Sequence, residues 1–371
     1  MKVLHFYKTY YPNTYGGVEQ VIFQLAEGGR RLGLETEVLS LSSEASARGR
    51  QLGQHVCHYS KQNFELASTG FSLSAIADFK ELALQADIVH YHFPWPFMDL
   101  VHFLASTGKP SLVSFHSDIV RQKALLRLYS PLMQRFLASV DRIVAASPNY
   151  VQSSPVLQQH LNKVQVIPYG LDQSSYAKPS AALVDSWRSR VGERFFLFVG
   201  VLRYYKGLHV LLDAIANAPY TVVIAGAGPV ESELRAQASR LGLRNLHLLG
   251  EVSEDDKSAL FELSLAMVFP SHLRSEAFGI SLLEGAMFGK PLISCEIGSG
   301  TSYINIHGET GLVVPPNDAL ALREAMYTLW GSADSCTRFG ENARKRFEKV
   351  FTSEQMNKQY LGAYNKILLA N

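Results

Sequence analysis

The chain contains only three cysteines, and they lie far apart in the sequence. Cys57, Cys295 and Cys336 have neither the paired spacing of a zinc site nor the density of a disulfide-stabilised domain. An odd number of widely separated cysteines is typical of a reducing compartment. We therefore expect free thiols, without a structural zinc site or a disulfide framework.

The chain also lacks long hydrophobic runs and an excess of one charge. No apolar run reaches the roughly 18 residues of a membrane span, and residues 1–13 lack the apolar core of a signal peptide. The formal net charge is only +2, which argues against nucleic acid as the main partner. These absences predict a cytoplasmic protein with no nucleic-acid partner.

The 371 residues, 47% of them hydrophobic, exceed what one typical core holds, so we expect two domains. Strand and helix patterns alternate in two series, and the polar region 42–70 is left unassigned. The first series of predicted strands comprises Lys2–Tyr7, Glu37–Leu41, Ile88–Tyr91, Ser111–Phe115, Arg142–Ala146 and Val164–Ile167. The second comprises Phe195–Val199, Thr221–Ala225, Leu246–Leu249, Leu265–Phe269 and Leu292–Cys295.

This alternation predicts an α/β fold with two Rossmann-like, doubly wound parallel sheets. The junction is expected between Pro168 and Pro179, where a turn leads into a serine-rich stretch. We assign residues 1–172 to the first domain, residues 173–350 to the second and residues 351–371 to a last helix. In such sheets, ligands bind beyond the carboxyl ends of the strands.

Residues 271–317 carry the strongest functional signal, because two glutamates follow a buried strand there. Glu276 is expected in the loop before a helix over residues 278–288, and Glu284 lies one to two turns into that helix. The free backbone N–H groups and the positive dipole at the helix start suit a phosphate group. A glutamate inside the helix can accept hydrogen bonds from two neighbouring hydroxyls, such as a ribose diol. The alternative is a plain helix on a sheet with one solvated and one capping glutamate.

The motif S-E-A-F-G-I-x-x-x-E-x-x-x-x-G-x-P over residues 275–291 resembles the E-x7-E signature of glycosyltransferase family 4. The family's members are retaining enzymes that use nucleotide sugars and have the GT-B fold. The resemblance implies two Rossmann-like domains facing each other across a cleft, with the last helix crossing back to the first domain. It also implies that backbone groups of Phe278, Gly279 and Ile280 bind the diphosphate, Glu284 the ribose and Glu276 the donor sugar.

Two glycine or cation motifs match other parts of this family. The sequence YKTYYPNTYGG (residues 7–17) ends in Gly16 and Gly17 at a helix start, and its alternative is a plain turn. The resemblance places this backbone near the sugar phosphate. The sequence FVGVLRYYKG (residues 198–207) resembles the family's G-R-L-x-x-x-K-G, but Val201 stands where the arginine is usual. Lys206 therefore carries over as a diphosphate ligand, with Arg203 as a substitute; both are alternatively solvated loop cations.

His116 follows the predicted strand Ser111–Phe115, where ligands are expected. A single histidine at a strand end is often structural, which is the alternative here. The resemblance implies that His116 contributes to the catalytic site by hydrogen-bonding the donor sugar at its 6-hydroxyl, rather than by moving a proton. No Asp-x-Asp pair occurs in the chain. Metal-dependent glycosyltransferases of the other major fold use that pair, so no metal and no cofactor are expected beyond the nucleotide-sugar substrate.

The predicted function is the metal-independent, retaining transfer of a hexose, with GDP-mannose as the expected donor. The glycan acceptor, expected to be lipid-linked, belongs to cell-surface polysaccharide synthesis, because the sequence resembles bacterial mannosyltransferases. The first alternative is a UDP-sugar-dependent glucosyl- or N-acetylglucosaminyltransferase of the same fold. Two others are a glycoside hydrolase that uses the two glutamates and a non-catalytic carbohydrate-binding subunit.

The segment 121–142 mixes five cations with many apolar residues, and Pro131 is expected to kink or split its helix. One interpretation is a helix that binds at the surface of the inner face of the membrane. The other is an ordinary helix that packs on the core and exposes its arginines. Peripheral membrane contact therefore stays open.

Overall fold

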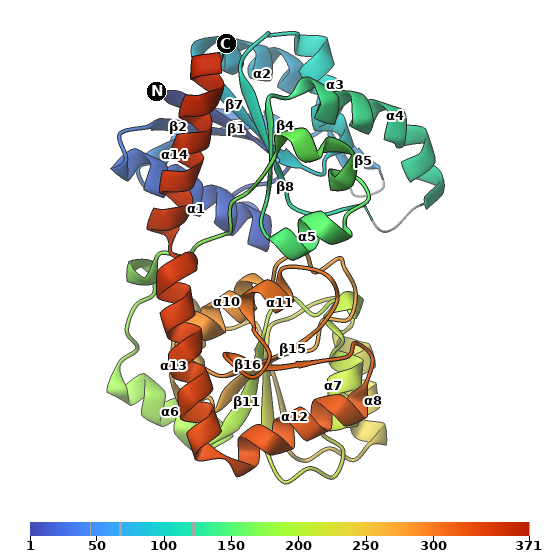
Figure 1. Cartoon of the computed structure of the whole chain (residues 1–371), viewed down its shortest axis with the longest axis vertical. Coiled ribbons are helices and arrows are strands. Elements are labelled where there is room, and N and C mark those ends of the chain that lie inside the picture. Colours follow the sequence, from blue (N-terminus) through green and yellow to red (C-terminus); the bar gives the residue numbers. More distant parts are fainter. Residues whose placement is uncertain (45, 67–68, 120–122, 371) are drawn as a thin grey trace. The chain divides into compact units, whose positions relative to one another are not determined.

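The computed structural model describes residues 1–44, 46–66, 69–119 and 123–370. The chain divides into two compact units (Figure 1). The first unit consists of Met1–Gly170 and Ser353–Asn371, and the second consists of Leu171–Thr352. The division therefore falls two residues before the position we assigned from the sequence. The last helix, α14 (Ser353–Ala370), belongs to the first unit.

The first unit contains an eight-stranded sheet with strand order β10-β9-β8-β7-β1-β2-β4-β3 among the described residues. Its strands are β1 (Lys2–Phe6), β2 (Glu35–Ser42), β3 (Ala47–Leu52), β4 (His55–Lys61), β7 (Ile88–Phe93), β8 (Ser111–Phe115), β9 (Arg142–Ala145) and β10 (Val164–Val166). All neighbours are parallel except β3, which runs antiparallel to β4 at one edge. The unassigned region 42–70 thus contributes β3, β4 and the start of a small hairpin. That hairpin consists of β5 (Phe64–Leu66) and β6 (Thr69–Phe71).

Helices connect these strands. They are α1 (Gly17–Arg31), α2 (Ser74–Gln85), α3 (Pro96–Ala105), α4 (Lys123–Ser139), α5 (Pro148–Ser153) and the short 3₁₀ helix η1 (Leu157–Lys163). Figure 1 shows α14 in red beside α1, and the Asn357 amide of α14 donates to the backbone oxygen of Gln24 at 3.1 Å. The buried tyrosines Tyr360 and Tyr364 of α14 face the sheet strand β7 through His90.

The second unit contains a six-stranded, fully parallel sheet with the order β13-β12-β11-β14-β15-β16 among the described residues. Its strands are β11 (Phe195–Val199), β12 (Thr221–Ala225), β13 (Leu246–Gly250), β14 (Ala266–Phe269), β15 (Leu292–Cys295) and β16 (Gly311–Val314). Its helices are η2 (Gln173–Ser175), α6 (Ala181–Val191), η3 (Tyr204–Lys206), α7 (Leu208–Ala214), α8 (Glu231–Arg240), α9 (Glu254–Leu263), α10 (Ile280–Met287), α11 (Thr301–Ile304), α12 (Ala319–Gly331) and α13 (Ala333–Val350).

The central strands are apolar along their whole length because helices cover both faces of a parallel sheet. Every residue of β11 and β14 is buried. Beyond β11 and β12, the backbone itself is closely packed: a Cβ atom at Gly226, whose φ is +137°, would lie 2.1 Å from the carbonyl oxygen of Gly200. Only glycine fits this contact. The two loops at the carboxyl ends of these strands are therefore held against each other.

The structure shows whether Pro131 splits the helix in the segment 121–142. Helix α4 continues through Pro131 as one helix, so the proline does not split it. Arg121 and Gln122 lie outside the described residues. Across the described ranges, no helix is both long enough and apolar enough to cross a membrane.

Candidate functional site

The loop between β14 and α10 places the first glutamate of the motif. The strand ends at Phe269, and α10 begins only at Ile280, two residues later than predicted. The reason is Gly279, which caps the helix with a φ of +99°, a left-handed conformation that interrupts the helical path. After α10, Gly289 adopts a φ of +67°, as a glycine that ends a helix does.

Glu276 forms a buried ion pair with Lys206. The carboxylate is 8% exposed and the lysine is also 8% exposed, and the lysine Nζ donates to Oε2 of Glu276. The Ser271 hydroxyl donates to the same oxygen at 3.3 Å. Lys206 Nζ also lies 4.7 Å from the centre of the Phe269 ring, a cation–π arrangement. Residues 70 positions apart in the sequence thus form one charge-neutral cluster at the ends of β11 and β14.

Glu284 lies inside α10 and is 3% exposed. Its Oε1 accepts two hydrogen bonds, from the Tyr176 hydroxyl and from Lys257 Nζ, each at 2.8 Å. Among the described residues, Oε2 has no protein partner, so one oxygen of this carboxylate stays available to a ligand. Burial alone would lower the pKa of Lys257, but the carboxylates of Glu284 and Glu254 raise it overall. Lys257 therefore remains cationic beside the Glu284 carboxylate.

Lys257 and Tyr176 were not predicted from the sequence as site residues. Lys257 lies in α9, after the cap formed by Ser253, and Tyr176 follows η2 near the start of the second unit. Neither lies in a motif that by itself indicates a site. Only the order of elements brings these residues together. Helix α9 precedes β14 and helix α10 follows it, so residues near the N-terminal ends of the two helices lie close to each other.

Arg203 takes a different position from Lys206. It is exposed and lines a pocket of about 330 Å³ with residues of η3 and α8, among them Tyr204, Gln237 and Arg240. Lys206 and the two motif glutamates are not part of that pocket's lining. The structure thus brings Lys206 to Glu276 but does not bring Arg203 into the same cluster.

Gly16 and Gly17 lie at the start of α1 in the first unit, with Gly16 as the cap and Gly17 as the first helical residue. Glu19 in the first helical turn is 8% exposed and accepts hydrogen bonds from the hydroxyls of Thr9 and Thr14, both at 2.9 Å. A Cβ atom at Gly16 would lie 2.6 Å from Oε2 of Glu19. A side chain at Gly16 would therefore displace the Glu19 carboxylate from its present position.

His116 directly follows β8 and is 6% exposed. Its Nε2 lies 2.9 Å from Nδ1 of His92, and its Nδ1 lies 2.5 Å from the Tyr169 hydroxyl. Burial lowers the pKa of His116 to about 3, so the ring is neutral at neutral pH. Both nitrogens are engaged inside the unit, which suits a fixed hydrogen-bonding group better than a proton shuttle.

Two family models match the chain. The model described as Glycosyltransferase Family 4 matches residues 15–175, and the model described as Glycosyl transferases group 1 matches residues 181–346. A D-rhamnosyltransferase, WbpZ, of Pseudomonas aeruginosa is 61% identical over 353 residues, which cover 95% of this chain and 93% of that protein. The O-antigen chain mannosyltransferase C of Escherichia coli is 52% identical over 368 residues, which cover 99% of each chain.

Solved structures of this fold resemble the chain along its whole length. Anabaena Alr3699/HepE, in complex with UDP and glucose, superposes with a TM-score of 0.78 at 20% identity and covers 98% of this chain and 99% of its own. A sucrose-phosphate synthase from Thermosynechococcus elongatus gives a TM-score of 0.79 at 18% identity and covers 100% of both chains. At these identities the likeness shows the fold, which is GT-B, and confirms the predicted fold class.

Proposed function

Because the chain belongs to glycosyltransferase family 4, we propose that this glycosyltransferase transfers a hexose from a nucleoside diphosphate sugar to a glycan in O-antigen synthesis. The proposed donor is GDP-mannose, and the proposed acceptor is a lipid-linked glycan. The mannosyltransferase of Escherichia coli, which matches over 99% of this chain, supports mannose and the O-antigen. The single observation that carries the proposal is the pair of buried motif carboxylates in the second unit, each held by its own lysine.

Each residue of the candidate site has a proposed role. The free Oε2 of Glu284 accepts the hydrogen bonds of the ribose diol, and Glu276 contacts the donor sugar. Lys206 and the backbone of Phe278, Gly279 and Ile280 at the start of α10 bind the diphosphate.

Three residues of the first unit complete the proposal. His116 hydrogen-bonds the donor sugar, and the backbone at Gly16 and Gly17 lies near the sugar phosphate.

Arg203 of the second unit binds the diphosphate only if its side chain leaves the pocket that it lines.

The proposed chemistry is transfer with retention at the anomeric carbon and without a metal. The bond between the anomeric carbon and the departing phosphate oxygen breaks, and an acceptor hydroxyl forms the new bond on the same face of the sugar. The acceptor's proton passes to the departing phosphate oxygen. Lys206 and the helix start supply positive charge for that oxygen, which is the role that a metal ion has in other transferases. Undiminished turnover after chelation of divalent metals is the expected result.

A second donor is favoured by a specific observation. The relative that is 61% identical is named as a D-rhamnosyltransferase, and D-rhamnose is mannose without the oxygen at carbon 6. The candidate contact of His116 at the 6-hydroxyl would be missing with that donor. Turnover of a nucleoside diphosphate D-rhamnose in preference to GDP-mannose would therefore reassign the donor and remove the proposed sugar contact of His116.

A panel of nucleotide sugars, assayed with the purified protein and a glycan acceptor, tests the donor. GDP-mannose is expected to be turned over and GDP to raise the melting temperature more than UDP does. A larger shift with UDP would instead favour the glucosyl- or N-acetylglucosaminyltransferase alternative. Release of sugar from a glycan without a nucleotide donor would favour a hydrolase, and no turnover of any donor would favour a carbohydrate-binding subunit. Glu284→Gln should lose donor binding if the ribose assignment is correct.

Peripheral membrane contact is the last part of the proposal. Helices α3 and α4 pack together through the hydrogen bond from the Tyr129 hydroxyl to Asp99. They expose Leu104 at 55% and Leu128 at 82%, and α4 also exposes arginines. Apolar side chains beside cations suit a surface of anionic lipids.

Sedimentation with anionic vesicles tests that contact. The protein should bind, and Leu128→Glu should weaken binding. The control is Leu369→Glu on α14, where the leucine is 88% exposed and lies on another helix. Equal loss with both variants, or no binding at all, would contradict a lipid-binding role for α3 and α4.

A further inference from the structure

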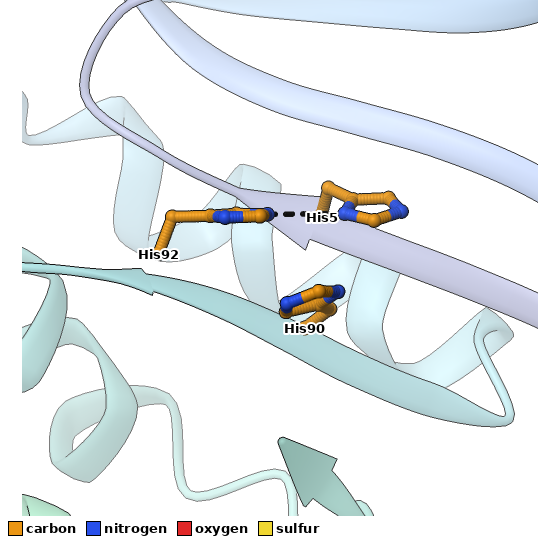
Figure 2. A group of neighbouring side chains, drawn as sticks. All are labelled: His5, His90 and His92. Atoms are coloured by element: carbon orange, nitrogen blue, oxygen red, sulfur yellow. Dashed lines mark hydrogen bonds between the residues drawn. The ribbon is translucent and has the colours of Figure 1, made fainter. Parts of the chain in front are cut away.

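Four histidines lie together in the interior of the first unit. His5 lies on β1, His90 and His92 lie on the neighbouring strand β7, and His116 directly follows β8. His5 and His90 are paired residues in the parallel register, and His90 and His92 are two positions apart and therefore lie on one face of the sheet. The exposed fractions of the first three are 0–1%. Figure 2 shows their rings close together.

A metal site is the first reading of His5, His90 and His92, because their ring nitrogens lie within 4.8 Å of one another. The geometry argues against it. The rings of His90 and His92 are stacked, with centres 4.3 Å apart and an angle of 23° between planes, so their in-plane lone pairs do not converge on one point. Both nitrogens of His90 are also engaged, with the Tyr364 hydroxyl and Ser114 Oγ at 2.7 Å each. A metal ion would have to break these bonds and bring uncompensated charge into the core.

The hydrogen bonds instead form one continuous chain of imidazoles. The Tyr169 hydroxyl lies 2.5 Å from Nδ1 of His116, Nε2 of His116 lies 2.9 Å from Nδ1 of His92, and Nε2 of His92 lies 3.1 Å from Nδ1 of His5. Each of the two links between rings joins an Nδ1 to an Nε2. Figure 2 shows the last of these links as a dashed line.

This pattern allows only two proton arrangements while the rings are neutral. A neutral imidazole has one N–H and one lone pair, and each link needs one of each. Either all three rings of the chain carry the proton on Nε2, or all three carry it on Nδ1. Any mixture places two lone pairs or two N–H groups against each other inside the core, which is costly. The tautomer of one ring therefore fixes the tautomers of the other two.

Tyr169 selects between the two arrangements. A phenol is a good hydrogen-bond donor and a weaker acceptor, and burial raises the pKa of Tyr169 well above its usual value, so the O–H is retained. These properties favour donation from the Tyr169 O–H to Nδ1 of His116 over the reverse direction. The protons of His116, His92 and His5 then all lie on Nε2, and each ring donates to the next one in the chain.

We infer that His92 and His5 are positioning residues for the transfer reaction, because the hydrogen-bond chain fixes His116 as the Nε2–H tautomer and commits Nε2 to His92. Only Nδ1 of His116 then remains for a substrate, and it acts as an acceptor. A sugar hydroxyl that binds His116 donates its proton to Nδ1 and takes the place of the Tyr169 hydroxyl. The positioning role of His92 and His5 rests on the proposed function, whereas the proton arrangement of the three rings does not depend on it.

Nuclear magnetic resonance of the full chain with ¹⁵N-labelled histidine tests the arrangement directly. Long-range correlations between ring nitrogens and carbon-bound protons distinguish the two neutral tautomers and the cation. His5, His92 and His116, assigned by single substitutions, should all be neutral Nε2–H tautomers at neutral pH. In Tyr169→Phe, the Nδ1 resonance of His116 should move toward that of an unbonded lone pair. An Nδ1–H or doubly protonated His116 in the wild-type protein would overturn the inference.

Kinetics of two His92 variants test the positioning role. His92→Asn keeps an oxygen near the place of Nδ1 that accepts the bond from His116, and His92→Leu removes every acceptor. A lost hydrogen bond to His116 should lower kcat of the leucine variant about tenfold, with kcat of the asparagine variant closer to wild type and donor KM little changed in both. If His92 had only a structural role, the leucine variant should have the higher kcat of the two. The buried core accommodates the leucine side chain better than the amide NH2 group of asparagine.

Melting temperatures of the two variants show whether both fold. If both fold and their kcat values fall equally, His92 does not act through His116 and the positioning role is refuted. If the wild-type protein transfers no sugar from any donor, the proposed function fails. The resonances of His5, His92 and His116 still decide the proton arrangement in that case, so the two failures are distinguishable.

Discussion

The buried histidines predict a steep loss of stability in the first unit below neutral pH. Burial lowers the pKa of His5 and His116 to about 3, and burial together with neighbouring histidines lowers the pKa of His90 and His92 well below the usual value. Apart from the histidines themselves, the described side chains with a hydrogen bond or ring contact to these rings are neutral, namely those of Tyr7, Ser114, Tyr169, Tyr360 and Tyr364. The nearby His55 lowers the pKa of His5 further. No partner in this set compensates a charge on an imidazolium ring.

The sign follows from proton binding. Below about pH 6.5, the unfolded chain protonates these histidines, whereas the folded unit, in which their pKa values are lowered, does not. The stability is therefore highest above this pH and is lost as the pH falls below it. Lowering the pH from about 7.5 to 5.5 should cost on the order of 1 kcal/mol for each such histidine, and several kcal/mol for the four together. That is a large part of the usual stability of a domain.

Trp95 offers an assay confined to this unit. It is fully buried in the first unit, and the chain contains three tryptophans, the others being Trp187 and Trp330 of the second unit. With both of those replaced by phenylalanine, urea unfolding monitored by tryptophan fluorescence reports the free energy of unfolding of the first unit.

In that background, His90→Gln should reduce the difference in unfolding free energy between the two pH values by on the order of 1 kcal/mol, whatever it does to stability at pH 7.5. Other histidines of the first unit also contribute to the wild-type difference between the two pH values. The quantity to compare is therefore the amount by which that difference falls in the variant. The exposed His307 of the second unit supplies the control His307→Gln, which should leave the value unchanged. An unchanged difference in His90→Gln would mean that the ring is protonated in the folded unit, and the reasoning would be refuted.

Two further predictions concern the second unit. Lys257→Met should raise the donor KM about tenfold or more, because the Glu284 carboxylate loses the charged hydrogen bond that holds its Oε1 in place; an unchanged KM would show that Lys257 has no part in donor binding. Gly279→Ala should lower kcat/KM strongly and destabilise the unit by about 1 kcal/mol or more, because its φ is +99° and the new Cβ would lie 3.2 Å from the Phe269 ring. The control is Gly308→Ala, where φ is +75° but nothing lies within 4 Å; it should cost stability alone, and an equal loss of activity would argue against a special role for Gly279.

The sequence predicted most of the architecture because parallel strands leave a strong pattern. Ser111–Phe115, Phe195–Val199 and Leu292–Cys295 were predicted with the bounds that the structure has. In contrast, β3 was missed because all but one of its residues are exposed, so no apolar alternation marks it. The short edge strand β16 was missed as well.

The site was predictable only where its residues share a motif. The two glutamates and Lys206 lie in recognisable patterns, and the structure joins Lys206 to Glu276. Lys257 and Tyr176 reach Glu284 through tertiary packing, which no local pattern contains. The same holds for the histidine chain: His5 and His116 lie 111 positions apart in sequence and are linked only through the order of strands in the sheet.

The ion pair of Lys206 and Glu276 allows stability and activity to be separated. Both groups are nearly buried, so removing one of them leaves an uncompensated charge, which typically costs about 3–5 kcal/mol. Lys206→Met should therefore destabilise the second unit, and the double variant Lys206→Met with Glu276→Gln should recover most of that loss. Activity should behave differently, because the proposed site needs the cation for the diphosphate and the carboxylate for the sugar.

The double variant should thus be stable but inactive in transfer, as measured by urea unfolding and by turnover of the donor. The purely structural alternative predicts that activity returns together with stability, since restoring the packing would then restore the function. A double variant that regained both would exclude the proposed roles of Lys206 and Glu276 together, whereas recovery of stability alone places the charges themselves in the reaction.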